Sequence, residues 1–231
     1  IYGKLGNLTM TKEGINVLMT NLTGKVPPIL QRLDYIRFNG EAAGYLHDLT
    51  LTGLFHTGAG MVKTDVMMSI DEQSMSRTYS GSVASADLDL GKLLNQEKKF
   101  GKVDFNVELK GFNYKNRYPE SYIKGIISSF EYSQYQYENI MLDGVYKDGG
   151  FNGRLSMDDA NGSVQIDGNF NVAKTIPDFN LKASVKNLRP HDLHLSDKYE
   201  NASISLGLTA DFTGKSIDDM NGRISLDSLQ L

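Results

Sequence analysis

The chain has 231 residues, which is enough to bury a sizeable core in one domain or in two small ones. Its formal net charge of −4 comes from 24 basic and 28 acidic residues, and this near balance points to neither a nucleic acid nor a strongly anionic surface as partner. The lack of cysteine excludes disulfides, thiolate metal ligands and cysteine nucleophiles.

The first predicted element is a short helix near residues 28–37. It follows two prolines that suit a helix start, within "PPILQRLDYIRF" at 27–38. The apolar residues on one face of this helix are Ile29, Leu30, Leu33 and Ile36. A second helical turn is predicted near 89–95, in "LDLGKLLNQ". Two such short helices cannot cover the apolar face of a large sheet, so other strands, missing sequence or a ligand must cover the rest.

The rest of the chain shows a period of two, which is typical of β-strands with one apolar and one polar face. The runs begin with Val62–Ile70 and continue almost to the C-terminus. Glycine-bearing turns separate them at 147–150, 159–162 and 212–216, and Asn161-Gly162 is the best short hairpin signal. We therefore expect an all-β fold, an antiparallel meander with one or two short helices.

The apolar side chains of these runs form a second prediction, a stripe along one face of the sheet. If the sheet stays open, this stripe lines a groove whose simplest ligands are acyl chains. If the sheet closes on itself, the same residues are the core of an ordinary sandwich, and periodicity does not separate the two. The predicted lining residues are Val103, Phe105, Val107, Leu109, Ile140, Leu142, Leu155, Met157, Val164, Ile166, Phe170, Leu181, Val185, Ile204, Leu206, Leu208, Phe212, Ile224 and Leu226.

Candidate metal ligands are few. His191 and His194 are three residues apart, a spacing that would bring two imidazoles together on a helix. Pro190 and the lack of a third clustered ligand argue against a metal, and "DDANGS" at 158–163 lacks the donor spacing of a calcium loop. We expect no metal and no cofactor.

Candidate catalytic groups are limited to scattered carboxylates. Asp87 with Asp89, or Asp218 with Asp219, are pairs of the kind that glycan chemistry uses. Carboxylates at turns are usually solvated, and no nucleophile elbow, phosphate loop or dinucleotide fingerprint is present. We therefore expect a protein that is not an enzyme.

The segment 112–137 is rich in tyrosine. Its rings are of a kind that stacks on bases or sugars and is common at protein interfaces, but only three basic residues accompany them. We interpret them as strand tyrosines on a half-exposed face, with contact to a partner or ligand as the second interpretation and no nucleic acid as partner.

Four stretches in order resemble a known family. They are "VPPILQRLDYIRFNG" at 26–40, "DLDLGKLLN" at 87–95, "GKVDFNVELKG" at 101–111 and "YENIMLDGVYKDGGFNGRLSMDD" at 137–159. The last contains a Y-x-N-I-x-L-x-G element at Tyr137, Asn139, Ile140, Leu142 and Gly144. Together they resemble the TamB proteins of the AsmA-like superfamily from Gram-negative cell envelopes.

This resemblance implies a long curved sheet shaped like a taco shell, with an apolar concave face that carries phospholipid between the inner and outer membranes. It implies a periplasmic protein anchored to the inner membrane through a segment not present here. It also implies a link to outer-membrane biogenesis, with a BamA-like outer-membrane barrel of the TamA type as partner through regions outside residues 1–231. We expect the chain, which opens at Ile1, to be one continuous β-rich segment of a longer protein.

Two alternatives to lipid transport stay open at this point. The first is a non-enzymatic scaffold that assists the assembly or secretion of outer-membrane proteins by strand addition at an exposed sheet edge. The second is a small closed lipid carrier that retains its ligand.

Overall fold

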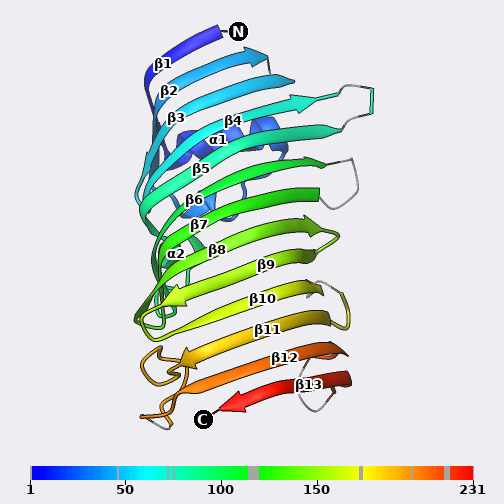
Figure 1. The fold of residues 1–231 in the computed structure, drawn as a ribbon. Helices are drawn as coiled ribbons and strands as arrows, with labels where there is room; N and C mark the ends of the chain where they lie inside the picture. The colour runs from blue at the N-terminus through cyan, green and yellow to red at the C-terminus, as the bar shows by residue number, and fades with distance from the viewer. Residues whose placement is uncertain are drawn as a thin grey trace.

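The computed structural model describes residues 2–45, 47–71, 73–74, 76–113, 120–171, 174–198, 200–215 and 219–230. Within these residues the fold is one antiparallel sheet of 13 strands whose spatial order is the order of the chain (Figure 1). The sheet is open, with β1 and β13 at its two edges. The predicted all-β meander is therefore confirmed.

Each strand contains 10 to 14 residues. Their bounds are β1 Tyr2–Thr11, β2 Tyr35–Tyr45, β3 Asp48–Thr57, β4 Gly60–Ile70, β5 Arg77–Asp89, β6 Phe100–Asn113, β7 Glu120–Tyr132, β8 Tyr135–Lys147, β9 Gly150–Asp159, β10 Gly162–Asn171, β11 Asp178–Leu188, β12 Ile204–Thr213 and β13 Asn221–Gln230.

Tight turns form where the sequence predicts them. Asp148 and Gly149 connect β8 to β9, both with positive φ, as a two-residue hairpin loop of type I′ requires. The β7–β8 loop at Ser133 and Gln134 has the same geometry, although neither residue is a glycine. The predicted turn at 159–162 also forms, between β9 and β10. Short turns such as these keep consecutive strands adjacent.

The helices differ from the prediction. α1, Lys12–Thr23, was not predicted. Its N-cap is Thr11, whose hydroxyl accepts a hydrogen bond from the Gly14 N–H, and its C-cap is Gly24 with φ 76°. The helix predicted near 28–37 is wrong over most of that length, because only a 3-10 turn (η1, Leu30–Arg32) forms before β2 begins. The turn predicted near 89–95 is confirmed as α2, Leu90–Leu94.

All three helical segments pack on the same face of the sheet, which we call the inner face. Ile15 of α1, Leu33 after η1 and Leu93 of α2 are buried together against Val62 and Phe105 of the sheet. In Figure 1 the strands bend along their length, and α1 and α2 lie inside the bend. The core is thus concentrated under the helices, over the first half of the sheet.

Candidate functional site

Cross-strand register aligns the inner-face side chains into rows that run perpendicular to the strands. Row 1 places an apolar residue on every strand except β5, where Ser85 occupies the position. Its members are Leu8, Phe38, Phe55, Val62, Ser85, Phe105, Ile127, Ile140, Met157, Val164, Val185, Leu206 and Leu229. Because directly opposed residues share a face, row 1 is an apolar line across the described sheet that Ser85 of β5 interrupts.

Row 2 lies two residues from row 1 on each strand, or three on β13 where the register shifts, and it is mostly aliphatic in the second half of the sheet. Its members are Gly40, Gly53, Thr64, Val83, Val107, Gly125, Leu142, Leu155, Ile166, Ala183, Leu208 and Leu226. Row 3 is built from small and aliphatic residues. Its members are Ala42, Leu51, Val66, Gly81, Leu109, Ile123, Gly144, Gly153, Gly168, Leu181, Ala210 and Ile224.

Row 4 is aromatic in the second half of the sheet. Its members there are Tyr146, Phe151, Phe170, Phe179 and Phe212. The ring centroids of Phe151 and Phe170 lie 5.6 Å apart, and those of Phe179 and Phe212 lie 4.7 Å apart and nearly parallel. The Phe151 ring also lies over Gly144 of row 3, because a Cβ added there would meet its Cζ at 2.5 Å. Glycine in row 3 thus makes room for the rings of row 4.

The structure brings the predicted lining residues to this one face. Seventeen of them lie in rows 1 to 4, and Ile204 stands two residues before Leu206 on the same strand. Val103 faces the same side but is only 6% exposed, because it is part of the core under the helices. It therefore does not line an open surface, and its prediction as a lining residue is wrong. The prediction of lining residues omitted three aromatic members of row 4, namely Tyr146, Phe151 and Phe179.

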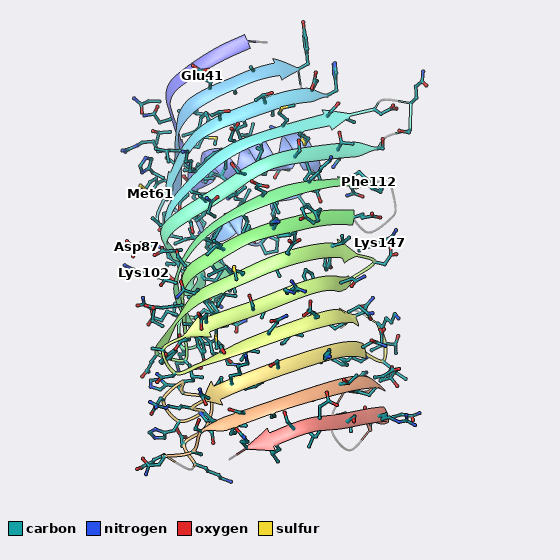
Figure 2. The ribbon with its side chains drawn as sticks, viewed as in Figure 1. Glu41, Met61, Asp87, Lys102, Phe112 and Lys147 are labelled. Carbon is teal, nitrogen blue, oxygen red and sulfur yellow. The ribbon has the colours of Figure 1, made fainter. Side chains whose placement is uncertain are left out.

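One long rim of the sheet is covered by chain segments, and we call it the capped rim. In Figure 2 it is the side on which Met61, Asp87 and Lys102 are labelled. Its connections include α1 with η1 (β1–β2), α2 (β5–β6) and the segment 189–203 (β11–β12). The tight turns β3–β4, β7–β8 and β9–β10 also lie at the capped rim. The opposite rim, where Phe112 and Lys147 are labelled, is the one at which β2 connects to β3, β8 to β9 and β10 to β11, and we call it the hairpin rim.

Hydrogen bonds tie the helical segments of the capped rim to the sheet. Lys92 Nζ of α2 donates to the Gly58 carbonyl at 3.0 Å and lies 3.4 Å from Asp34 Oδ2. The Arg32 guanidinium donates to the Leu93 carbonyl, which joins η1 to α2. These contacts hold the helices over row 1 in the first half of the sheet.

Residues 189–198 and 200–203, the described part of the β11–β12 connection, close the capped rim further along. Leu193 is fully buried, and its carbonyl accepts a 2.7 Å hydrogen bond from Tyr137 Oη. The Tyr135 ring packs edge-on to His194, and its hydroxyl donates to Asp159. Burial, and then the hydrogen bond to Asp159, raise the pKa of Tyr135 to about 12. These tyrosines of the 112–137 segment therefore have structural roles, while residues 114–119 of that segment lie outside the described residues.

The outer face carries alternating charges across six strands. The charged row consists of Glu108, Lys124, Asp143, Arg154, Asp167 and Lys182. Lys124 Nζ lies 3.2 Å from Asp143 Oδ2, and Arg154 Nε lies 2.7 Å from Asp167 Oδ1. Directly opposed unlike charges stabilise a sheet modestly when exposed, so this ladder helps to fix the register.

The pKa of Asp143 is lowered, first by the hydrogen bond that Tyr122 Oη donates at 2.8 Å and then by the one from Lys124. Two hollows of about 500 Å³ each open on this outer face, beside the charged row. Met67 and Tyr122 line one of them, while Ile126 and Met141 line the other. These hollows mix charged and apolar walls, in contrast to the apolar rows of the inner face.

The histidines take no part in a metal cluster among the described residues. His191 Nδ1 lies 3.6 Å from Asp192 Oδ1, and His194 Nδ1 is hydrogen-bonded to the Ser133 carbonyl at 2.9 Å. No group of three potential ligands comes together in the part of the chain that the structure describes. Asp87, one of the candidate acid–base carboxylates, pairs with Lys102 at 3.1 Å, and Asp89 caps α2.

None of the helices within the described ranges is long and apolar enough to cross a membrane. Comparison of the chain with protein-family models gave no match, and comparisons with curated proteins and with solved structures gave none either.

Proposed function

We propose that this segment binds phospholipid on its inner face and carries it along the rows, across the strands. The observation that supports this proposal is the cross-strand pairing that extends rows 1 to 3 from β2 to β13. The part beyond the helices, from β8 to β13, covers five strand spacings, about 24 Å, by about 20 Å, or on the order of 500 Å². Apolar patches of this size on a monomer are often functional.

The chemistry of transport along such a surface needs no catalytic group. Acyl chains exchange contact with water for contact with aliphatic side chains, which is favourable by roughly 25 cal/mol per Å² of buried apolar area. Within rows 1 and 2, neighbouring strands from β8 to β13 present similar aliphatic side chains, so a bound chain meets no large energy step as it moves from strand to strand. Headgroups stay in water at an open rim.

The resemblance to TamB proteins agrees with this proposal and supplies its setting. In that setting the segment lies in the periplasm of a Gram-negative cell and is anchored to the inner membrane through sequence not present here. The BamA-like barrel partner of the TamA type would be met through regions outside residues 1–231. The same protein would then serve outer-membrane biogenesis.

A charged step placed among rows 1 to 4 of the inner face, which we call the trough, tests the proposal. The variant Leu206→Asp/Leu208→Asp puts two carboxylates into rows 1 and 2 of β12, where passage of an acyl chain requires their desolvation. The matched control, Ser184→Asp/Thr209→Asp, places two carboxylates on the exposed outer face of β11 and β12. Transfer of fluorescent phospholipid between donor and acceptor vesicles is the assay, with circular dichroism to verify folding.

The proposal predicts that the trough variant loses transfer and that the control retains it. A folded trough variant that transfers lipid as fast as the unmodified chain would contradict the proposal.

A scaffold for membrane-protein assembly is the second candidate. This role requires an exposed sheet edge, which offers backbone groups to which an incoming strand pairs. Crosslinkers along β13 that capture unfolded outer-membrane protein, together with trough crosslinkers that capture no lipid, would favour the scaffold over the conduit.

A further inference from the structure

The outer face of β7 and β8 carries exposed apolar side chains on both sides of the charged row. Toward the capped rim, Ile126 of β7 and Met141 of β8 oppose each other and are 49% and 52% exposed. Toward the hairpin rim, Tyr122 of β7 opposes Val145 of β8 and is 39% exposed. These four side chains line the two outer-face hollows of about 500 Å³ each. Apolar side chains that gather around hollows on an exposed face are typical of an interaction surface.

The charged row indicates which partner fits this surface. Its acidic residues are on β6, β8 and β10, and its basic residues are on β7, β9 and β11. Consider two copies of the chain that meet through their outer faces. A two-fold axis that is parallel to the strands and passes between two of them sets every even-numbered strand against an odd-numbered strand of the second copy. Acidic residues then face basic ones, so the row is complementary to a second copy of itself.

The apolar side chains place this axis between β7 and β8. With the axis there, β7 faces β8 of the second copy. Ile126 then meets Met141 of the second copy, and Tyr122 meets Val145, each pair occurring twice because the contact is symmetric. An axis in either neighbouring gap sets these side chains mostly against polar ones, for example Met141 against Ser156. Only the β7–β8 axis joins all four apolar side chains.

The charges near this axis also match. Lys124 faces Asp143 of the second copy, and Glu108 faces Arg154 of the second copy. Because Lys124 Nζ lies 3.2 Å from Asp143 Oδ2 of its own chain, four charges of alternating sign meet on the axis. Within one chain Glu108 and Arg154 are on β6 and β9, three strand spacings or about 14 Å apart. Only a second copy therefore brings these two side chains together.

The shape and size of the outer face suit such a contact. The strands bend with α1 and α2 inside the bend (Figure 1), so the outer face is convex along the strands. Two convex faces touch along a line that runs across the strands, and the charged row follows this line. From β4 to β11 the contact covers seven strand spacings, about 34 Å, by about 20 Å, or on the order of 700 Å². Specific interfaces bury about 800 Å² per partner.

We propose that two copies of the chain form a dimer through the outer faces of β4 to β11, with the two-fold axis parallel to the strands and between β7 and β8. The apolar pairs at the centre supply buried area, and the opposed charges select the register of the two copies. The dimer uses the outer face alone. It leaves both inner faces open and does not depend on what they bind.

A pair of charge reversals tests this register. Glu108→Lys sets two basic residues against each other in the homodimer, and Arg154→Glu sets two acidic residues against each other. Each variant alone is expected to dimerise about tenfold or more weakly than the unmodified chain in sedimentation velocity. An equimolar mixture of the two variants opposes acid to base at both positions, so the heterodimer is expected to form as tightly as the unmodified dimer. Mixing does not repair a defect within one chain, and circular dichroism verifies folding.

The apolar centre supplies a second measurement. Met141→Asp is expected to weaken dimerisation about tenfold or more, because the carboxylate would face Ile126 of the second copy. The control is Leu195→Asp, at 53% exposure in the β11–β12 connection, and it should dimerise normally. An unmodified chain that stays monomeric at about 100 μM would overturn the proposal, since interfaces of this size reach micromolar affinity or better. Equal effects of the two Asp variants, or mixed charge variants that form no heterodimer, would overturn it as well.

Discussion

Thr64 offers a quantitative test of how the inner face is packed. It lies in row 2 between Gly53 and Val83, it is only 9% exposed, and its hydroxyl has no hydrogen-bond partner. A buried hydroxyl without a partner costs about 1–3 kcal/mol. Thr64→Val keeps the branched shape and removes that cost, so we expect the free energy of unfolding to rise by about 1–2 kcal/mol. For a chain of this length the melting temperature then rises by about 2–8 °C.

The assay must allow for the topology, because each strand pairs only with its neighbours in sequence and the two halves of the sheet can unfold separately. Urea denaturation is therefore combined with hydrogen exchange of peptides from β3 to β5. The control is Thr52→Val on the outer face, where the hydroxyl donates to Asp65 Oδ1 at 2.9 Å, and no gain is expected. A Thr64→Val variant that exchanges faster in β3–β5 would refute the reasoning.

Three further predictions concern the helix, the glycine row and the charged row. Ile15→Ala, at a position 1% exposed, should cost about 2–5 kcal/mol in thermal or urea unfolding, whereas Val17→Ala, at 63% exposure on the same helix, should stay within about 0.5 kcal/mol. Gly153→Ala should lower the free energy of unfolding by about 1–3 kcal/mol, because its Cβ would lie 2.3 Å from the Asp143 carbonyl oxygen. The control is Gly207→Ala, whose Cβ would have its nearest contact at 3.4 Å. Equal melting temperatures of the two variants would contradict the close packing at Gly153. Because the folded pKa of Asp143 is lowered, its contribution to stability is present above the ordinary value of 3.8 and is lost as pH falls below that value. Asp143→Asn should therefore flatten the pH dependence of the free energy of unfolding in that range. An unchanged pH profile would contradict a stabilising role for the charged row.

The strands were predictable from sequence because alternation is a local signal. Val164-Ile166 and Leu206-Leu208 alternate with polar residues. Asp148 and Gly149 are residue types that favour the positive φ values of a two-residue hairpin turn. The region after Pro28 misled the prediction, because its apolar spacing fits a helix while Ile36 and Phe38 also alternate as in a strand. Ladder hydrogen bonds from β1 and β3 decide for the strand, and these partners are distant in sequence.

The trough was predictable only in part, because rows depend on register. A slip of one residue moves every side chain of a strand to the other face. β-bulges set that register, for example the one between Ser85 and Leu88 on β5. No local sequence signal predicts the position of this bulge. The alignment of Gly144, Gly153 and Gly168 under the aromatic row is equally nonlocal.

Native mass spectrometry of the intact chain, purified from bacterial cells in a mild detergent, tests the central claim most directly. The account predicts that the chain retains one or more phospholipids, that Leu206→Asp/Leu208→Asp loses them and that Ser184→Asp/Thr209→Asp keeps them. A chain that carries no phospholipid, or a trough variant that carries as much as the unmodified chain, would contradict it.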